Sequence, residues 1–173
     1  MDADDWRYRG PLFPFNFDVV FTSASITPAK GGAPPPNVTT VRLCNASFSE
    51  VSGLEATMEP KVIKEGGRNY GTVQRVGPVT FATVVLKRGI SGITDLYTWF
   101  DLVSGGAYAN RMTATITLYG PDRGDSPSII YQWTLLRAMP TKFKTADFNA
   151  TASAVGIEEL HIVHEGMQQV PGS

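Results

Sequence analysis

The sequence is poor in cysteine and in charge. Cys44 is the only cysteine among 173 residues, so the chain cannot form an internal disulfide. Charged residues make up 18% of the chain, below the usual level of about a quarter, and 15 Lys and Arg nearly balance 16 Asp and Glu. The lack of a basic excess argues against a surface for nucleic acid. A net charge of -1 does not oppose self-association.

The sequence also lacks the apolar segments of membrane and secreted proteins. No apolar run reaches the roughly 18 residues that a membrane helix needs. Residues 1–5 are acidic, whereas a secretory signal begins with basic residues followed by an apolar stretch. We therefore expect a protein that is made and folded in a cytosol, and we interpret residues 1–14 as an N-terminal arm.

No catalytic signature is present. There is no glycine-rich phosphate loop ending in Lys and Ser or Thr, and no nucleophile motif of the Gly-X-Ser-X-Gly type. His161 and His164 are three residues apart, so on a strand they point to opposite faces and cannot share a metal ion. Glu55 and Glu59 are about 13 Å apart on an extended strand, which is too far for paired carboxylate chemistry. The sequence thus predicts no enzyme, no cofactor and no metal site.

Alternating apolar and polar residues predict an antiparallel β protein. The clearest alternation lies in segments 15–21, 111–119, 129–137 and 154–164. Segments 39–48 and 79–88 predict two more strands, and the second of these is apolar on both faces, which favours a central place in the sheet. We expect Pro140 to end the strand 129–137 and residues 142–149 to be a connector. A bulge is predicted near Glu158 and Glu159, where the apolar phase slips.

Residues 93–104 predict the one helix. Its apolar positions, which recur at helical spacing, are Leu96, Trp99, Phe100 and Val103. Gly105 and Gly106 are expected to end it. The predicted fold is therefore mainly β: two packed antiparallel sheets forming a sandwich or barrel, with one amphipathic helix and a long projecting hairpin.

The predicted β domain spans residues 15–167. It includes a long Gly- and Pro-rich loop at 23–37, which cannot continue a sheet. Residues 168–173 form a C-terminal tail that we expect to fray.

The most informative stretch is the predicted hairpin at 54–76. Alternation over residues 54–65 corresponds to ~40 Å at ~3.3 Å per residue, roughly twice the length of an ordinary strand. Gly66 and Gly67 predict a turn, after which residues 70–76 return alongside. We interpret the hairpin as an assembly arm, because it outreaches the core of a small domain and exposes unpaired backbone at its edges.

The arm has two different faces. The apolar face consists of Leu54, Ala56, Met58 and Val62. The polar face consists of Glu55, Thr57, Glu59 and Lys61. Pro60 cannot donate a ladder hydrogen bond, so it predicts an edge position or a bulge within the arm.

An ordered series of segments between residues 15 and 167 resembles one protein family. The segments are F-N-F-D-V-V-F, F-S-E-V-S-G-L-E, K-E-G-G-R-N-Y, V-V-L-K-R-G-I-S with D-L-Y-T-W-F, and A-V-G-I-E-E-L-H-I-V-H-E-G-M. Together they resemble the inner tail tube proteins of contractile phage tails and of extracellular contractile injection systems.

The resemblance implies a structural, ring-forming protein. In that family six copies make a ring whose inner sheets join into one large barrel, and rings stack into a tube that passes DNA or effector cargo. The implied partners are the sheath, the baseplate or spike, and the tail terminator. Such a protein would be made in the cytoplasm of a bacterial host and become part of a phage tail or an injection particle.

The resemblance also implies roles for the arm. It would join neighbouring subunits and face the next ring, through Lys61, Val62, Ile63, Lys64, Glu65, Arg68 and Tyr70. Its polar face, made of Glu55, Thr57, Glu59 and Lys61, would line the lumen or meet a neighbouring subunit.

Two alternatives stay open. The loop at 23–37 is longer than the family's first hairpin leads us to expect, so the chain could be an initiator or adaptor ring that joins the tube to the baseplate spike. The alternative of a different class is a monomeric β-sandwich binding module. That alternative predicts a short arm, with Glu55 and Glu59 exposed on a lone domain.

Overall fold

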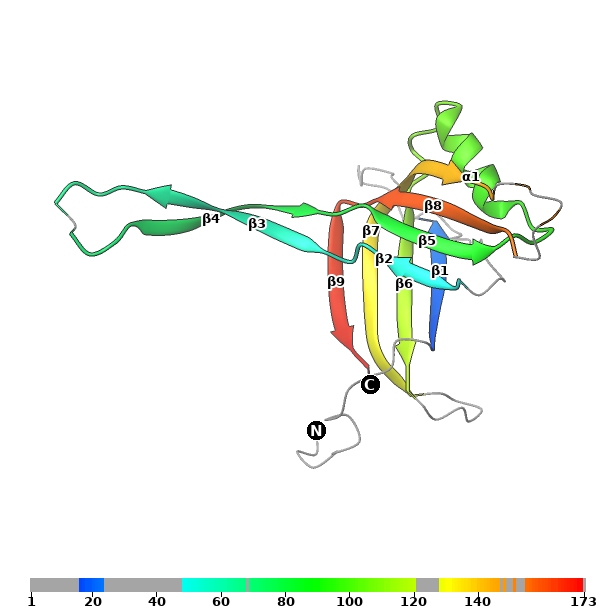
Figure 1. Cartoon of the computed structure of the whole chain (residues 1–173), viewed down its shortest axis with the longest axis horizontal. Coiled ribbons are helices and arrows are strands. Elements are labelled where there is room, and N and C mark those ends of the chain that lie inside the picture. Colours follow the sequence, from blue (N-terminus) through cyan, green and yellow to red (C-terminus); the bar gives the residue numbers. More distant parts are fainter. Residues whose placement is uncertain are drawn as a thin grey trace, which may run out of the picture.

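The computed structural model describes residues 16–23, 48–67, 69–120, 128–146, 148, 151 and 155–172. In chain order their elements are β1 Phe17–Ser23, β2 Glu50–Ser52, β3 Ala56–Ile63, β4 Val73–Phe81, β5 Val84–Gly89, α1 Asp95–Ser104, β6 Met112–Tyr119, β7 Ile129–Lys144, β8 Ile157–Val163 and β9 Gly166–Pro171 (Figure 1). No helix in this part of the chain combines the length and apolar composition needed to cross a membrane.

Seven strands form one antiparallel sheet in the order β1-β6-β7-β8-β5-β2, with β9 also paired to β7. β3 and β4 form a separate two-stranded hairpin. The prediction of a mainly β fold with one helix is confirmed. The described residues contain no closed barrel, and two halves of one continuous sheet take the place of two separate sheets.

β7 joins the two halves because it changes partners along its length. Leu135 pairs with β6 on one side and β9 on the other, whereas Met139 already pairs with β8. Arg137 lies between them at φ 54, in the left-handed region, and the β6–β7 register shifts there. Such a bulge bends a strand. The result is a four-strand half (β1, β6, β7 and β9) and a crossing half (β7, β8, β5 and β2), visible in Figure 1.

Pro140 does not end this strand, so that prediction is wrong. β7 runs for 16 residues, through Pro140 and into residues 142–144, for which the sequence predicts a connector. The last residue of β7 that pairs with β6 is Ala138. Pro140, two residues later, therefore interrupts no hydrogen bond between β7 and β6. On the other side the register with β8 shifts between Pro140 and Lys142, which accommodates the missing N–H.

Both halves of the sheet and α1 share one core. Its buried members are Val19, Phe21, Phe48, Val84, Leu86, Leu96, Trp99, Val103, Ala114, Ile116, Leu135, Ala138, Leu160 and Ile162. The Trp99 ring packs edge-on against Phe21 with centroids 5.3 Å apart, and its Nε1 donates to the Asn110 carbonyl at 3.2 Å. The predicted helical stripe is therefore confirmed, with Phe100 half-buried at its margin.

Two predicted strands have different bounds. The segment 79–88 is not one central strand: β4 ends at Phe81 and β5 begins at Val84, because the chain there leaves the hairpin and enters the sheet. β8 has no bulge at Glu158 and Glu159, since its register with β5 is constant along the whole pairing. The apolar phase slips for another reason, which is that Glu158 points inward.

The chain end is also more ordered than predicted. Residues 166–171 form β9, which pairs with β7, so the expected fraying after residue 167 is wrong. Strand 39–48 lies outside the described residues except for Phe48, which is buried ahead of β2. The N-terminal arm 1–14 lies outside the described residues, as does the loop 23–37 beyond Ser23.

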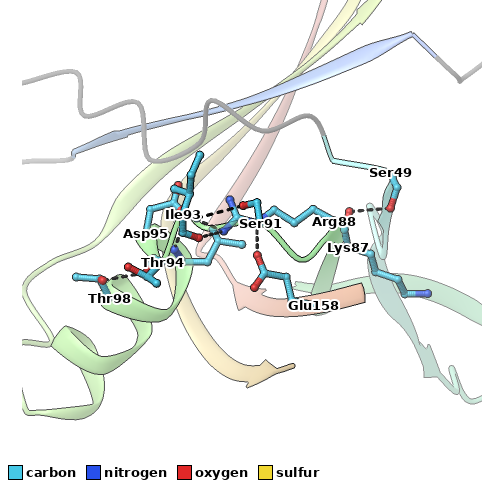
Figure 2. Close-up of polar contacts among 10 residues, drawn as sticks. Ser49, Lys87, Arg88, Ser91, Ile93, Thr94, Asp95, Thr98 and Glu158 are labelled. Carbon is cyan, nitrogen blue, oxygen red and sulfur yellow. Dashed lines mark hydrogen bonds and ion pairs between the residues drawn. The ribbon is translucent and has the colours of Figure 1, made fainter. Parts of the chain in front are cut away.

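A buried charge cluster holds α1 against the crossing half (Figure 2). Arg88 on β5 is 1% exposed, and its Nε donates to Glu158 on β8. Its Nη2 donates to Asp95 Oδ1 at 2.7 Å and to the Ile93 carbonyl at 2.9 Å. Asp95 also accepts from the Leu96 N–H, so one carboxylate begins the helix and ties it to the sheet.

The ionised state of Arg88 depends on these partners. Burial lowers its pKa, but the hydrogen bonds and charges of Asp95 and Glu158 outweigh burial and raise its pKa above the ordinary value. Removing one partner from such a cluster leaves an uncompensated buried charge, which typically costs about 3–5 kcal/mol.

We expect Arg88→Met to lower the free energy of unfolding by about 3–5 kcal/mol, because two carboxylates lose their counter-charge. Chemical denaturation followed by tryptophan fluorescence measures the loss. Lys87→Met is the matched control, since Lys87 lies next in sequence and pairs with Glu50 at the surface. Equal losses in the two variants would contradict a special role for the buried cluster.

Candidate functional site

The β3–β4 hairpin projects from the body of the molecule (Figure 1). Its strands pair only with each other, and every residue of β3 is exposed. At its base the Ala82 N–H donates to the Glu55 carbonyl at 3.1 Å. The predicted arm therefore exists, although its regular strands are Ala56–Ile63 and Val73–Phe81, so the return strand begins and ends later than predicted.

A bulge interrupts the hairpin beside Pro60, as predicted. Met58 pairs with Val79 and Pro60 pairs with Val76, so two residues of β4 oppose Glu59 alone. One of the two is Gly77, where an added Cβ would lie 2.8 Å from the Glu59 carbonyl oxygen. The close approach of the two backbones explains why glycine occupies this position.

The pairing gives the hairpin one apolar face. Its cross-strand pairs are Ala56–Phe81, Met58–Val79, Pro60–Val76 and Val62–Gln74. The exposed fractions are 50% for Met58, 56% for Val62, 71% for Val76 and 47% for Val79. Residues of β4 thus supply half of a strip that the sequence prediction assigned to β3 alone. A contiguous apolar strip in water marks a surface for another protein.

The opposite face is mostly polar and carries like charges near its outer end, where the apolar pair Ile63–Val73 follows them. Thr57 lies opposite Thr80, and Lys61 lies opposite Arg75. Like charges directly opposite each other destabilise an isolated hairpin. Glu55 and Glu59 lie nearer the body, and both are exposed.

The predicted contact residues lie at the outer end of the arm. Lys61, Val62 and Ile63 are on β3, Lys64 and Glu65 follow it, and Tyr70 precedes β4, whereas Arg68 lies outside the described residues. Tyr70 is 94% exposed. The residues that the prediction missed are Gln74, Val76, Val79 and Phe81. The sequence signal for these residues was the three valines at positions 73, 76 and 79. The sequence pattern assigned the last of them to the predicted central strand 79–88 instead.

The base of the arm stacks on a buried histidine. The Phe81 and His164 rings lie 4.9 Å apart, and His164 Nδ1 is 3.0 Å from the Gly166 carbonyl oxygen. Burial lowers the pKa of His164, although the hydrogen bond to Gly166 opposes the shift. Next to it, Glu165 pairs with Arg111 and with Arg137 at the bend of β7. The arm is thus attached where β8 leads into β9.

The described residues offer no obvious site for chemistry. No three His, Cys, Asp or Glu side chains among them gather to hold a metal ion. A cavity of about 140 Å³ is lined only by apolar side chains: Phe17, Val51, Leu54, Ile116, Leu118 and Trp133. A lining without a titratable group supplies neither an acid nor a base.

The comparison with protein families decides the identity. A family model described as T4-like virus tail tube protein gp19 matches residues 14–168. The chain belongs to this family. It is a structural, non-enzymatic tail tube protein of contractile phage tails or injection systems, and so a component of such a particle. The resemblance seen in the sequence is confirmed.

Solved structures share the fold of this tail tube protein. A chain in the cryo-EM structure of the anti-feeding prophage (AFP) baseplate is 23% identical with a TM-score of 0.71, covering 94% of this chain and 97% of that chain. A chain in the extended sheath-tube complex of the extracellular contractile injection system PVC is 17% identical with a TM-score of 0.70, covering 99% of both chains. A search of curated proteins finds no match.

The lowered pKa of His164 predicts acid sensitivity. The unfolded chain takes up a proton at the ordinary pKa of about 6.5, whereas the folded chain resists it, so stability is present above that pH and falls as the pH drops below it. The free energy of unfolding should therefore fall more between pH 7.5 and pH 5.5 in the unmodified protein than in His164→Gln. Equal losses, measured by urea denaturation at both pH values, would refute the assignment.

Proposed function

We propose that this tail tube protein forms six-membered rings that stack into the inner conduit of a contractile tail or injection particle. Family membership supports a tube, and the similar chains come from a sheath-tube complex and from a baseplate solved with 6-fold symmetry. The proposed partners are the sheath, the baseplate or spike and the tail terminator, with DNA or an effector protein as cargo.

The observation that carries this proposal is the pair of free edges on the four-strand half. Among the described residues β1 pairs only with β6, and β9 pairs only with β7. Neighbouring strands are antiparallel throughout, so four strands leave β1 and β9 running in opposite directions. The β9 edge of one copy therefore matches the β1 edge of the next as an antiparallel pair, and repeating this contact closes a ring without exposed edges.

The arm supplies the second contact. Its apolar face becomes buried against a neighbouring copy, in a heterologous contact of arm to body. Lys61, Lys64 and Arg75 at its outer end meet acidic or polar groups of that neighbour, which offsets the repulsion between Lys61 and Arg75. The polar face with Glu55, Thr57 and Glu59 lines either the interface or the rim of the lumen.

An initiator or adaptor ring at the baseplate is the second candidate. It is favoured by the likeness to a chain in the AFP baseplate structure. The long arm with its exposed apolar strip disfavours a monomeric binding module, which would leave this strip in water.

A charge on the apolar face of the arm should prevent assembly. Val76→Glu should remain folded, because Val76 is 71% exposed in the single chain, but it should give monomers where the unmodified protein gives rings or tubes. Thr98→Glu places the same charge at an exposed position of α1, away from the arm, and should still assemble. Light scattering and negative-stain images compare the two. Rings of Val76→Glu at unmodified yield would exclude the apolar face as an interface.

Shortening the arm should separate folding from assembly. Pro60 and Val76 lie opposite each other, so a Gly-Gly turn can replace residues 61–75 without disturbing the rest of the hairpin. The shortened chain should be a monomer whose unfolding midpoint is close to that of the full chain, since the core contains none of residues 61–75. If it still forms rings, the arm is not required for assembly.

A further inference from the structure

The four-strand half has a second face, turned away from the core, that is rich in hydroxyl and amide groups. Side chains alternate along each strand, so every second residue of β1, β6, β7 and β9 belongs to this face. One row across it runs through Val20, Thr115, Thr134 and Gln168, each paired with the next. None of the four is charged, and three of them carry a hydroxyl or an amide.

The adjacent row contains one charged side chain. It runs through Asp18, Thr117, Gln132 and Val170. Gln132 Nε2 donates to Thr117 Oγ1 at 3.5 Å, so the polar groups in the middle of the row partner each other. The third row begins with the pair Thr22 and Thr113, and at the bulge of β7 both Leu136 and Arg137 lie opposite Thr113. Arg137 pairs with Glu165. Asp18 lies at the margin, on the edge strand β1.

The placement of the other elements decides which way this face points in a ring. The opposite face of the four-strand half bears the core, and the crossing half and α1 pack on it. These elements cannot fit inside a closed ring of strands, so they lie outside it. The face with the threonines and glutamines is then the inner wall. This step rests on the ring closure proposed above.

We propose that this hydroxyl- and amide-rich face is the surface along which cargo passes, and that it suits polypeptide cargo of either charge sign. A wall with fixed charge retains molecules of the opposite sign and excludes those of its own. Polypeptides differ in the sign of their net charge, whereas nucleic acid is always negative and is held by Lys and Arg. A wall whose three central rows contain one marginal carboxylate and one arginine, itself paired with Glu165, has no excess of either sign and discriminates by size instead of charge.

The test uses assembled tubes and charged probes of equal size. Tubes are formed with two variants of one small folded protein that differ only in the sign of their net charge, or with a labelled single-stranded DNA oligonucleotide. Sedimentation then measures the retained probe. We expect unmodified tubes to retain the two proteins within about twofold of each other and to retain little oligonucleotide. Thr115→Lys should shift the protein ratio towards the acidic probe by on the order of tenfold at low salt, and added salt should reverse it.

The control places the same charge elsewhere. Ser104→Lys lies at the exposed end of α1, outside the proposed wall, and should leave the ratio unchanged. The proposal is overturned if unmodified tubes prefer one sign of protein, or if Thr115→Lys behaves as Ser104→Lys does. Strong, salt-dependent retention of the oligonucleotide by unmodified tubes would overturn it in favour of nucleic acid cargo.

A second measurement covers the case in which Thr115→Lys fails to assemble. Thr115→Cys in a Cys44→Ser background is labelled with maleimide-gold after assembly, and Ser104→Cys is labelled in parallel. Gold should lie along the tube axis for the first variant and outside the tube for the second. Gold outside the tube at Thr115 would overturn the proposal. Failure of the unmodified protein to form tubes would instead overturn the proposed function.

Discussion

The rest of the structure depends on the backbone hydrogen bonds of β7. The sixteen residues of β7 need partners for their N–H and C=O groups, and among the described residues no single neighbouring strand is long enough to supply them. β7 therefore pairs with β6 and β9 first and with β8 afterwards, and the change requires the bend at Arg137. That bend places one half of the sheet across the other and encloses the core. The same bend leaves β1 and β9 as the two ends of a four-strand unit.

The body and the arm meet different physical needs. The body buries its apolar residues within a single chain, through the core shared by α1 and both halves of the sheet. The arm buries almost nothing, and its Met58, Val62, Val76 and Val79 remain exposed. A two-stranded hairpin alone in water is marginally stable. Its length and apolar strip therefore have a physical rationale only when a neighbouring copy covers them, which is why the arm belongs with assembly rather than with folding.

Two clusters of paired charges stabilise particular features of the fold. Arg88 is satisfied in the interior by Glu158 and Asp95, and Glu165 joins Arg111 to Arg137 at the bend of β7. The first cluster ties α1 to the crossing half, and the second joins Glu165 to the bend of β7. The low charge content of the chain thus agrees with a wall of threonines and glutamines on the free face of the four-strand half.

The sequence by itself determined the local patterns. Alternation at Val19 and Phe21, helical spacing from Leu96 to Val103, and a bulge beside Pro60 were predicted correctly, because each depends on neighbouring residues alone. The predicted strand over 54–65 is shorter in the structure, where β3 has 8 residues. Only the tertiary structure decided which strands lie beside one another. Pro140 was predicted to end a strand, and it does not, because β7 has already left β6 at that point. Glu158 interrupts the apolar alternation of its strand, and the sequence pattern therefore predicted a bulge there. The structure shows that its partner is the buried Arg88, 70 residues away. The apolar strip of the arm likewise needed the register of β3 against β4, since pairing between distant segments is set by packing and leaves little trace in a single stretch of sequence.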